Sequence, residues 1–262
     1  MVEGLELIQR APGKRRSGAR PLLFVHGAYA GAWCWDRGFL EFFAKRGWSA
    51  SAVSLRGHGP GASAFPPAAG PGLRDYADDV RAARKRVGDN AILIGHSMGA
   101  AAIQKLMEDE DAPDAAAFFA PIPLTGLLGP SLRLSLSDPL AFQALMAAQA
   151  FGPDAAPPDA LARVFFADPA TAANAEDFRS ESPRALIDLA WLDLPAPHRW
   201  RPTQAFVARG SQDLCVSRLE AEGVADALDA PLTDLPGLGH AVMLEAEWRV
   251  AAQALLDWLE RL

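Results

Sequence analysis

Seven short apolar runs, separated by stretches with helical periodicity, constrain the fold of this chain more than any other feature of its sequence. The strand-like runs are Leu5–Gln9, Pro21–His26, Ser49–Ser54, Ala91–Gly95, Ala115–Ala120, Gln204–Arg209 and Leu232–Leu235. The helical patterns are Trp33–Arg46, Arg74–Val87, Met98–Glu108, Ser217–Leu228 and Glu245–Leu262. Because the runs are continuously apolar rather than alternating, both faces of each strand are expected to be buried. The sequence therefore predicts an α/β fold in which helices cover both faces of a parallel sheet.

Residues 122–202 interrupt this alternation, because no convincing core strand occurs between Pro121 and Pro202. Short helices separated by prolines fit this segment, at Asp138–Phe151, Asp159–Phe166 and Pro183–Asp193. Its apolar side chains need a surface to cover, so we expect a lid that lies over the sheet. The predicted organisation is a core of residues 1–121 and 203–262 with a helical cap of residues 122–202.

Composition and charge exclude several classes of function. The 262 residues have a net charge of −7 and a pI near 5.3, which gives no electrostatic case for binding nucleic acid. The two cysteines, Cys34 and Cys215, are too few for a disulfide framework. No apolar run reaches the roughly 18 residues of a membrane span, and the N-terminus has no signal-peptide pattern. We expect a cytoplasmic protein that acts on a small molecule, with neither a nucleic-acid nor a membrane partner. Its 21 arginines against 4 lysines are typical of a GC-rich bacterial genome.

The segment Gly95-His96-Ser97-Met98-Gly99 lies between a strand pattern and a helix pattern and fits the G-x-S-x-G motif. A serine on such a sharp turn has a strained backbone, and the two glycines leave room where side chains would clash. The turn exposes the hydroxyl above the sheet, beside the N-terminus of the next helix. An ordinary turn before a helix is the alternative interpretation. The strand before the motif and the helix after it favour a nucleophile.

A serine hydroxyl needs a general base, and the base needs an acid that orients it. His240 follows the last predicted strand, and Asp213 follows the strand before it. Taken alone, His240 also fits a turn, and Asp213 also fits a helix N-cap or a turn. Reacting groups of parallel sheets gather at the carboxyl ends of strands, and all three residues follow strands. The chain order Ser97, Asp213, His240 therefore predicts a catalytic triad.

A tetrahedral intermediate also needs two N–H donors for its oxyanion. The stretch His26-Gly27-Ala28 comes at the end of an early strand run, so we assign the backbone N–H of Ala28 as one donor. The backbone N–H of Met98, directly after the serine, is the other. We interpret His26 and Gly27 as supports of this loop rather than as a second base. His96 is interpreted as packed structure.

The sequence gives no sign of a cofactor or a metal. The run Gly57–Ala62 formally fits a dinucleotide fingerprint, but Pro60 and Pro66 prevent the helix that the fingerprint requires. P-loop, HExxH and His/Cys-cluster motifs are absent from the sequence. We therefore expect chemistry that side chains and backbone amides carry without a cofactor.

Taken together, these segments resemble the α/β-hydrolase superfamily over nearly the whole chain. The stretches that carry the resemblance are "FVHGAYAGAWCW", "SLRGHGPG", "IGHSMGAA", "GSQDLCV" and "GLGHAVMLE". The resemblance implies an eight-stranded, mostly parallel sheet flanked by helices, with a helical cap inserted after strand 6, at Ile122–Pro202. It also implies an active site between cap and sheet, lined by the loop Ala28–Trp35.

Details of the motifs narrow the activity that the resemblance implies. A serine at position 97, rather than an aspartate, argues against dehalogenases and epoxide hydrolases. Ala241 stands where the related cyanohydrin lyases have a lysine, which argues against lyase chemistry. Carbon–carbon bond hydrolases and cofactor-free haloperoxidase- or perhydrolase-like enzymes carry the same Ser–Asp–His set and stay open as alternatives.

We therefore predict a serine hydrolase of the carboxylesterase type, acting through an acyl-enzyme on esters of small to medium apolar acyl groups. The candidate pocket residues are Tyr29 and Trp33 in the loop and Phe142 and Met146 in the cap. Hydrophobic packing of cap on core is the alternative interpretation of the cap side chains. A ligand-binding receptor with the same fold is the non-enzyme alternative.

Overall fold

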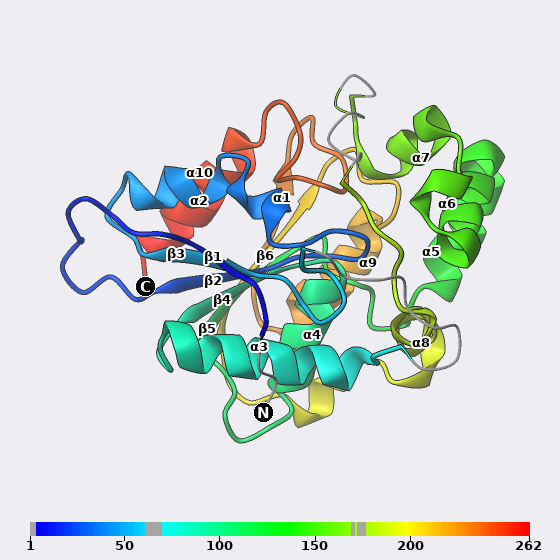
Figure 1. Cartoon of the computed structure of the whole chain (residues 1–262). Helices are drawn as coiled ribbons and strands as arrows, with labels where there is room; N and C mark the ends of the chain where they lie inside the picture. The colour runs from blue at the N-terminus through cyan, green and yellow to red at the C-terminus, as the bar shows by residue number, and fades with distance from the viewer. Residues whose placement is uncertain (1–3, 61–69, 169–170, 172–176) are drawn as a thin grey trace.

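A seven-stranded sheet runs through the centre of the molecule in the computed structural model, which describes residues 4–60, 70–168, 171 and 177–262 (Figure 1). In spatial order the strands are β1 (Leu7–Arg10), β3 (Ala50–Val53), β2 (Leu22–Val25), β4 (Ile92–His96), β5 (Ala115–Phe119), β6 (Gln204–Gly210) and β7 (Leu232–Leu235). β1 pairs antiparallel with β3, and the other neighbouring strands of this sheet pair in parallel. The carboxyl ends of the parallel strands therefore lie at one edge of the sheet.

The central strands bury both of their faces, as their apolar sequences predict. In β2, Leu22 and Phe24 belong to the apolar cluster on one face. Leu23 and Val25 belong to the cluster on the other face. The side chains alternate along the strand, so one run of four apolar residues supplies both layers of the core.

Helices cover each face of the sheet. On the first face lie α1 (Trp33–Asp36), α2 (Phe39–Ala44) and α10 (Arg249–Leu259). On the second lie α3 (Leu73–Val87), α4 (Met98–Leu106) and α9 (Arg218–Ala227). Figure 1 shows α2 and α10 above the sheet and α3 below it. This three-layer arrangement leaves the carboxyl ends of the strands as the edge that these six helices do not cover.

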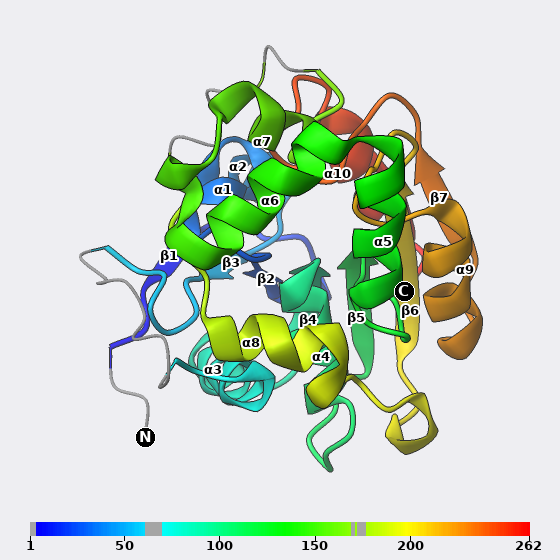
Figure 2. The same ribbon diagram turned by 90° about the vertical axis from the view of Figure 1, so that its right-hand side faces the viewer.

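Between β5 and β6 the described residues form helices: α5 (Leu128–Ser137), α6 (Pro139–Phe151), η1 (Pro153–Ala155), α7 (Pro158–Phe165), α8 (Pro183–Ile187), η3 (Asp188–Leu192) and η4 (Pro197–Arg199). We call residues 122–202 the helical segment. Proline starts α6, α7 and α8, where its missing N–H removes no helical hydrogen bond. Figures 1 and 2 show α5, α6 and α7 packed together on one side of the sheet. The definition of the helical segment as a separate cap domain stays a prediction, because Leu134 and Val164 share an apolar cluster with β2.

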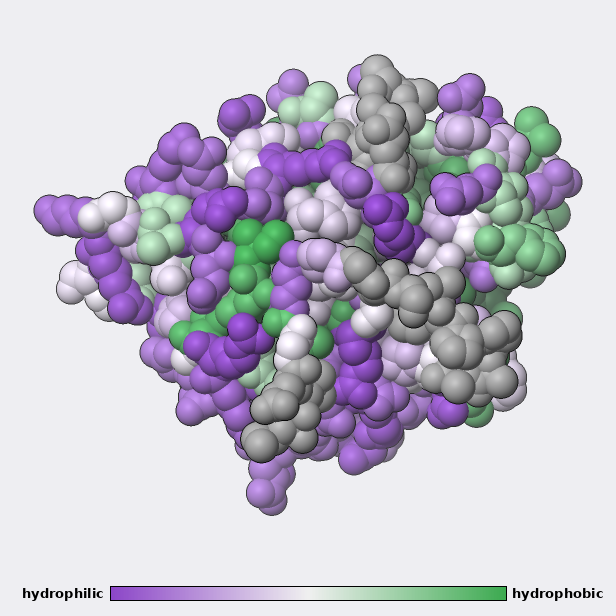
Figure 3. All heavy atoms as spheres, viewed as in Figure 1, coloured by the Kyte–Doolittle hydropathy of each residue, from purple (hydrophilic) through white to green (hydrophobic). Residues whose placement is uncertain are grey.

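Part of the apolar surface of the helical segment faces solvent. Leu132, Leu136 and Phe151 are 63%, 77% and 81% exposed. Green areas at the right of Figure 3 lie over this part of the molecule. The expectation that the apolar side chains of this segment cover the sheet is therefore wrong for these three. Among the described helices, none is both long enough and apolar enough to cross a bilayer.

The elements differ from the sequence expectations in three respects. The described residues form seven strands rather than the eight that the resemblance implies, and the helical segment follows β5. The seven apolar runs each form one strand, and the core sequence has no eighth run. The predicted helix Trp33–Arg46 is divided, with Gly38 at φ 118° between α1 and α2. Helix α5 was not predicted, because its leucines alternate with other residues at a period of two. The glycine run at Gly57–Ala62 extends into residues 61–69, which lie outside the described residues.

Candidate active site

Ser97 lies at the junction of β4 and α4, in a backbone conformation that residues other than glycine rarely adopt. Its φ is 51° and its ψ is −116°, a conformation that costs about 1–3 kcal/mol. A Cβ on Gly95 would lie 2.6 Å from the Cα of Ala100. A Cβ on Gly99 would collide with the carbonyl oxygen of His26. The glycines of the motif are therefore required by the close approach of neighbouring backbone.

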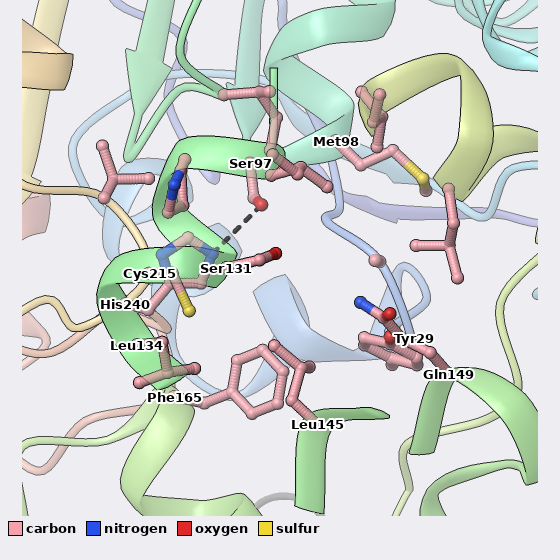
Figure 4. Close-up of a pocket in the computed structure, with 17 residues that line it drawn as sticks. Tyr29, Ser97, Met98, Ser131, Leu134, Leu145, Gln149, Phe165, Cys215 and His240 are labelled. Atoms are coloured by element: carbon pink, nitrogen blue, oxygen red, sulfur yellow. Dashed lines mark hydrogen bonds between the residues drawn. The ribbon is translucent and has the colours of Figure 1, made fainter. Parts of the chain in front are cut away.

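The side chains of Ser97, His240 and Asp213 form a continuous chain of hydrogen bonds. Ser97 Oγ lies 3.0 Å from His240 Nε2, the contact drawn as a dashed line in Figure 4. His240 Nδ1 lies 2.9 Å from Asp213 Oδ2. The carboxylate can only accept, so Nδ1 carries the proton and Nε2 is free to accept from the serine hydroxyl. All three residues are buried. The structure thus brings together the three residues that the sequence predicts as a triad.

Backbone amides hold Asp213 in the turn that follows β6. Its Oδ1 accepts hydrogen bonds from the amides of Cys215 at 2.7 Å and Val216 at 2.9 Å. Its other oxygen is left for His240. Asp213 therefore makes the turn contacts of the alternative interpretation and the contact to histidine at the same time.

The two residues predicted to bind an oxyanion border the same cavity as Ser97. The Ala28 amide makes no hydrogen bond to the described part of the chain. Met98 is the first residue of α4, so its amide has no partner within the helix. The loop lies close to the elbow: a Cβ on Gly27 would be 2.6 Å from His96 Nδ1 and 3.1 Å from Ser97 Cβ. Two backbone donors are therefore available beside the serine hydroxyl.

His26 is a neutral support of the loop that carries Ala28. Its Nδ1–H donates to the carbonyl of Gly27 at 2.8 Å, and its Nε2 accepts from the amide of Leu55 at 3.0 Å. Burial, with the nearby His58 adding to its effect, lowers the pKa of His26 to about 3. This placement fits the role of a support, because neither ring nitrogen is available to a substrate.

The loop that carries His240 is fixed from two sides. His96 Nε2–H donates to the carbonyl of His240 at 2.9 Å. Burial, with the nearby His240 adding to it, lowers the pKa of His96 well below its usual value, so the ring stays neutral. Glu245 Oε1 accepts from the amides of Gly239 at 2.8 Å and Ala167 at 2.6 Å. The sequence did not predict this role, because nothing distinguishes Glu245 from a solvent-exposed glutamate at the start of a helix.

A cavity opens in front of Ser97, between the sheet and the helical segment, and has a volume of about 650 Å³ when the part open to solvent is included. Most of its wall is apolar and comes from the helical segment, including Leu134, Leu145 and Phe165 (Figure 4). A second, smaller hollow also borders Ser97 and His240. Ser97 therefore borders two hollows whose walls are mainly apolar.

Of the four predicted pocket residues, Tyr29 lines the cavity and the other three do not. The Trp33 ring instead lies 4.7 Å from the guanidinium of Arg37 and packs beside Phe178. An aromatic residue in this loop can contact substrate or neighbouring side chains with equal ease, so the sequence pattern did not distinguish the two.

The side chains of α6 that face the cavity are not Phe142 and Met146, the two that the sequence predicts. Leu145 and Gln149, one helical turn apart, line the cavity. Met146 follows Leu145 directly and is therefore rotated away by about 100°. Phe142 packs against the apolar cluster instead. The prediction for Phe142 and Met146 assigned the right helix and the wrong face.

Ser131, Gln149 and Cys215 are polar side chains in the cavity wall that the sequence did not predict. The one signal for Gln149 was its position near the end of an otherwise mainly apolar helix. Cys215 also lies with Asp213 and His240 in the one set of possible metal donors among the described residues, within 4.8 Å of one another. Burial raises the pKa of the Cys215 thiol well above its usual value, which disfavours the thiolate that a metal binds. Acid–base chemistry fits this set better than metal binding.

Comparisons with solved structures show the same fold. A thermophilic esterase from Thermogutta terrifontis superposes with a TM-score of 0.72 at 18% identity, over 98% of this chain and 93% of that one. An esterase from Exiguobacterium antarcticum gives 0.73 at 17% identity, over 99% and 97%. The enol-lactonase from Burkholderia xenovorans gives 0.69 at 17% identity, over 98% and 98%. The search of curated protein sequences finds no match.

Fold and site define a class: an α/β-hydrolase fold with a serine at the turn after β4 and an imidazole hydrogen-bonded to it. The model of the alpha/beta hydrolase family matches residues 22–254, and the chain belongs to this family. Membership supports hydrolytic chemistry on small molecules. The bond that is cleaved has to be argued from the site itself.

Proposed function

We propose that this protein is a serine hydrolase that cleaves carboxylic esters through an acyl-enzyme. The observation that carries the proposal is the hydrogen-bond chain from Ser97 Oγ through His240 to Asp213, with distances of 3.0 and 2.9 Å, at the wall of an apolar cavity. A serine hydroxyl becomes a useful nucleophile when a neutral, oriented imidazole can take its proton. The tautomer of His240 that Asp213 selects is the one this step needs.

In the acylation step, Ser97 Oγ attacks the acyl carbon and its proton passes to His240 Nε2. Asp213 stabilises the imidazolium that forms, and the oxyanion accepts hydrogen bonds from the amides of Ala28 and Met98. When the ester C–O bond breaks, His240 returns the proton to the leaving alcohol. A water molecule then attacks the acyl-enzyme, gives its proton to His240, and releases the acid as Ser97 regains the proton.

The cavity supports a neutral ester with a small to medium apolar acyl group. Among the described residues, no lysine, arginine, aspartate or glutamate lines it. A charged substrate group would lose its hydration there without gaining an ionic partner.

The proposal is tested by labelling with a fluorophosphonate probe and by turnover of p-nitrophenyl esters of increasing chain length. We expect labelling and turnover in the wild type and neither in Ser97→Ala. Ser135→Ala is the matched control, because Ser135 is a partly exposed serine of α5 whose hydroxyl, within the described part of the chain, bonds only to the carbonyl of Leu132. We expect Ser135→Ala to keep both the fluorophosphonate labelling and the ester turnover.

Three results would contradict the proposal in different ways. Turnover retained by Ser97→Ala removes Ser97 as the nucleophile. Labelling without steady-state turnover favours a receptor that reacts once. Labelling with turnover of carbon–carbon substrates or of peroxide and halide, but not of esters, favours the carbon–carbon bond hydrolase or the haloperoxidase.

A further inference from the structure

The hydroxyl of Tyr29 is a buried polar group at the wall of the cavity. Tyr29 is only 3% exposed and lines the cavity in front of Ser97. Within the described part of the chain, its Oη makes no hydrogen bond of normal length. Buried polar groups are nearly always hydrogen-bonded, to protein, water or a ligand. The proposed mechanism makes no use of this hydroxyl.

The position of the Tyr29 ring is fixed by contacts that do not involve the hydroxyl. The backbone of Tyr29 has a φ of 66°, and its amide donates to Glu181 Oε2 at 3.3 Å. The ring packs edge-on against Phe165 with centroids 6.0 Å apart and lies 6.5 Å from the ring of Phe178. The hydroxyl is therefore held at the cavity wall before any substrate binds.

Gln149 of α6 brings a second neutral polar group to the same place. Figure 4 shows Tyr29 and Gln149 side by side, across the cavity from His240. Burial raises the pKa of Tyr29 strongly and the charge of Glu181 adds to this, while a long hydrogen-bonding contact with the side chain of Gln149 opposes the shift. Gln149 has two N–H donors and one carbonyl, so the pair can offer two donors to one acceptor atom.

The charges around this pair select a neutral acceptor. The raised pKa keeps the Tyr29 hydroxyl protonated, so it acts as a donor. Glu181 carries its negative charge nearby, since the pKa of its carboxyl is lowered: burial would raise it, but contacts with His58, Tyr76 and Ser182 prevail. His58 balances part of this charge, but a substrate carboxylate would find no cation to pair with in the described cavity wall, which favours a neutral acceptor.

We infer that the cavity takes esters that carry a second, neutral oxygen acceptor, such as a ketone or amide carbonyl, and that Tyr29 and Gln149 bind this oxygen. The inference rests on the proposed function, because the same substrate must present its scissile ester to Ser97. The remaining, apolar part of the substrate contacts the apolar wall of the cavity. An ester without the second oxygen leaves the Tyr29 hydroxyl facing carbon, which lowers its relative kcat/KM.

The test compares kcat/KM within matched pairs of esters. One series pairs the p-nitrophenyl esters of 4-oxopentanoate, 5-oxohexanoate and 6-oxoheptanoate with the corresponding plain alkanoates. A second series pairs oxoalkyl acetates with plain alkyl acetates, so that the ketone lies in the alcohol half. We expect the wild type to prefer the oxo member of at least one pair. Tyr29→Phe, which removes one oxygen and keeps the ring, lowers that preference about tenfold, and Gln149→Leu lowers it as well.

Leu145→Ala is the matched control for these variants. Leu145 lies one turn before Gln149 on the same face of α6 and is apolar. Its replacement changes both members of a pair by a similar factor and leaves the preference unaltered. The preference compares two substrates of one variant, so a partial loss of folded protein cancels.

The outcomes separate this inference from the proposed function. Ester turnover without an oxo preference in either series overturns the inference alone. A preference that Tyr29→Phe and Gln149→Leu leave unchanged does the same. If the wild type neither reacts with the fluorophosphonate nor turns over any ester, the proposed function fails and the inference fails with it.

Discussion

The Glu181 carboxylate accepts a hydrogen bond from His58 Nε2 at 3.0 Å, and neither side chain is exposed to solvent. Its other oxygen accepts from the hydroxyl of Tyr76 and the amide of Ser182, each at 2.7 Å. The amide of Tyr29 completes the set at 3.3 Å. Glu181 belongs to the helical segment, whereas His58, Tyr76 and Tyr29 precede it in the chain. One buried carboxylate thus joins the helical segment to the loop beside Ser97.

Replacing Glu181 by alanine is expected to destabilise the protein strongly. The substitution leaves His58 and Tyr76 buried without their acceptor, and removing one member of a buried ion pair costs about 3–5 kcal/mol. Glu41→Ala is the matched control, because Glu41 pairs with Lys45 on the exposed surface of α2, where such pairs contribute little. Urea denaturation of both variants measures the free energies of unfolding. Equal values for the two variants would show that the buried pair contributes nothing special.

The same pair gives the stability a defined pH dependence. Burial works against the charged form of each group, but the attraction between His58 and Glu181 prevails. The pKa of His58 is therefore raised above 6.5 and that of Glu181 lowered below 4.5. The His58 contribution is complete below pH 6.5 and is lost as the pH rises through its raised pKa. The Glu181 contribution is complete above pH 4.5 and is lost as the pH falls through its lowered pKa.

We therefore expect the difference in free energy of unfolding between wild type and Glu181→Gln to be largest between pH 4.5 and 6.5. The buried His26, whose pKa is about 3, has the opposite effect on the total: below pH 6.5 its unfolded form takes up a proton that its folded form does not. His26 is present in both proteins, so the difference, rather than the total, is the quantity to measure. Urea titrations at a series of pH values provide it. A difference that declines neither above nor below this window contradicts the prediction.

The strands and the grouping of the three candidate catalytic side chains could be predicted from the sequence, for two physical reasons. Strands that are buried on both faces have continuous apolar sequences. The strands β2 and β4 can therefore be recognised in the sequence without knowing which strands they pair with. Ser97, Asp213 and His240 each follow a parallel strand, and such ends meet at one edge of the sheet. Both rules need only local sequence and chain order.

Glu181 and Gln149 could not be predicted in the same way. The partner of Glu181, His58, is 123 residues away in the chain, and no local pattern records the contact. The role of Gln149 depends on which face of α6 meets the cavity, and the predominantly apolar composition of that helix does not define a face. The prediction that Trp33 lines the pocket is wrong for a related reason, since stacking on Arg37 and contact with a substrate require the same kind of side chain.

Two helical glycines provide a test of the elbow geometry. In α9 a Cβ on Gly223 would meet nothing within 4 Å, so Gly223→Ala is expected to stabilise the protein by about 0.4–1 kcal/mol. In α4 a Cβ on Gly99 would collide with the carbonyl oxygens of His26 and Val25. Gly99→Ala is therefore expected to lower Tm and to slow labelling of Ser97, despite the same gain in helix propensity. Thermal unfolding and labelling rates check both variants, and equal Tm values would contradict the close approach.

Asp213→Asn tests whether the tautomer of His240 carries the activity. The asparagine Oδ1 can still accept from the amides of Cys215 and Val216, so the turn and the Tm are expected to persist. Its NH₂ group then donates toward His240 Nδ1, which moves the imidazole proton to Nε2, where it faces Ser97 and cannot accept a proton. Ester turnover is expected to fall about 10⁴-fold, the size of this effect in serine proteases that use the same three groups.

The control for this substitution is Asp234→Asn. Asp234 lies on β7 and pairs with Arg209 and Arg218 away from the cavity, so the variant is expected to keep ester turnover. Steady-state rates with a p-nitrophenyl ester compare the two variants at one pH. If Asp213→Asn is folded and as active as Asp234→Asn, the proton on His240 is not controlled by Asp213, and the hydrogen bond of 2.9 Å between them is structural only.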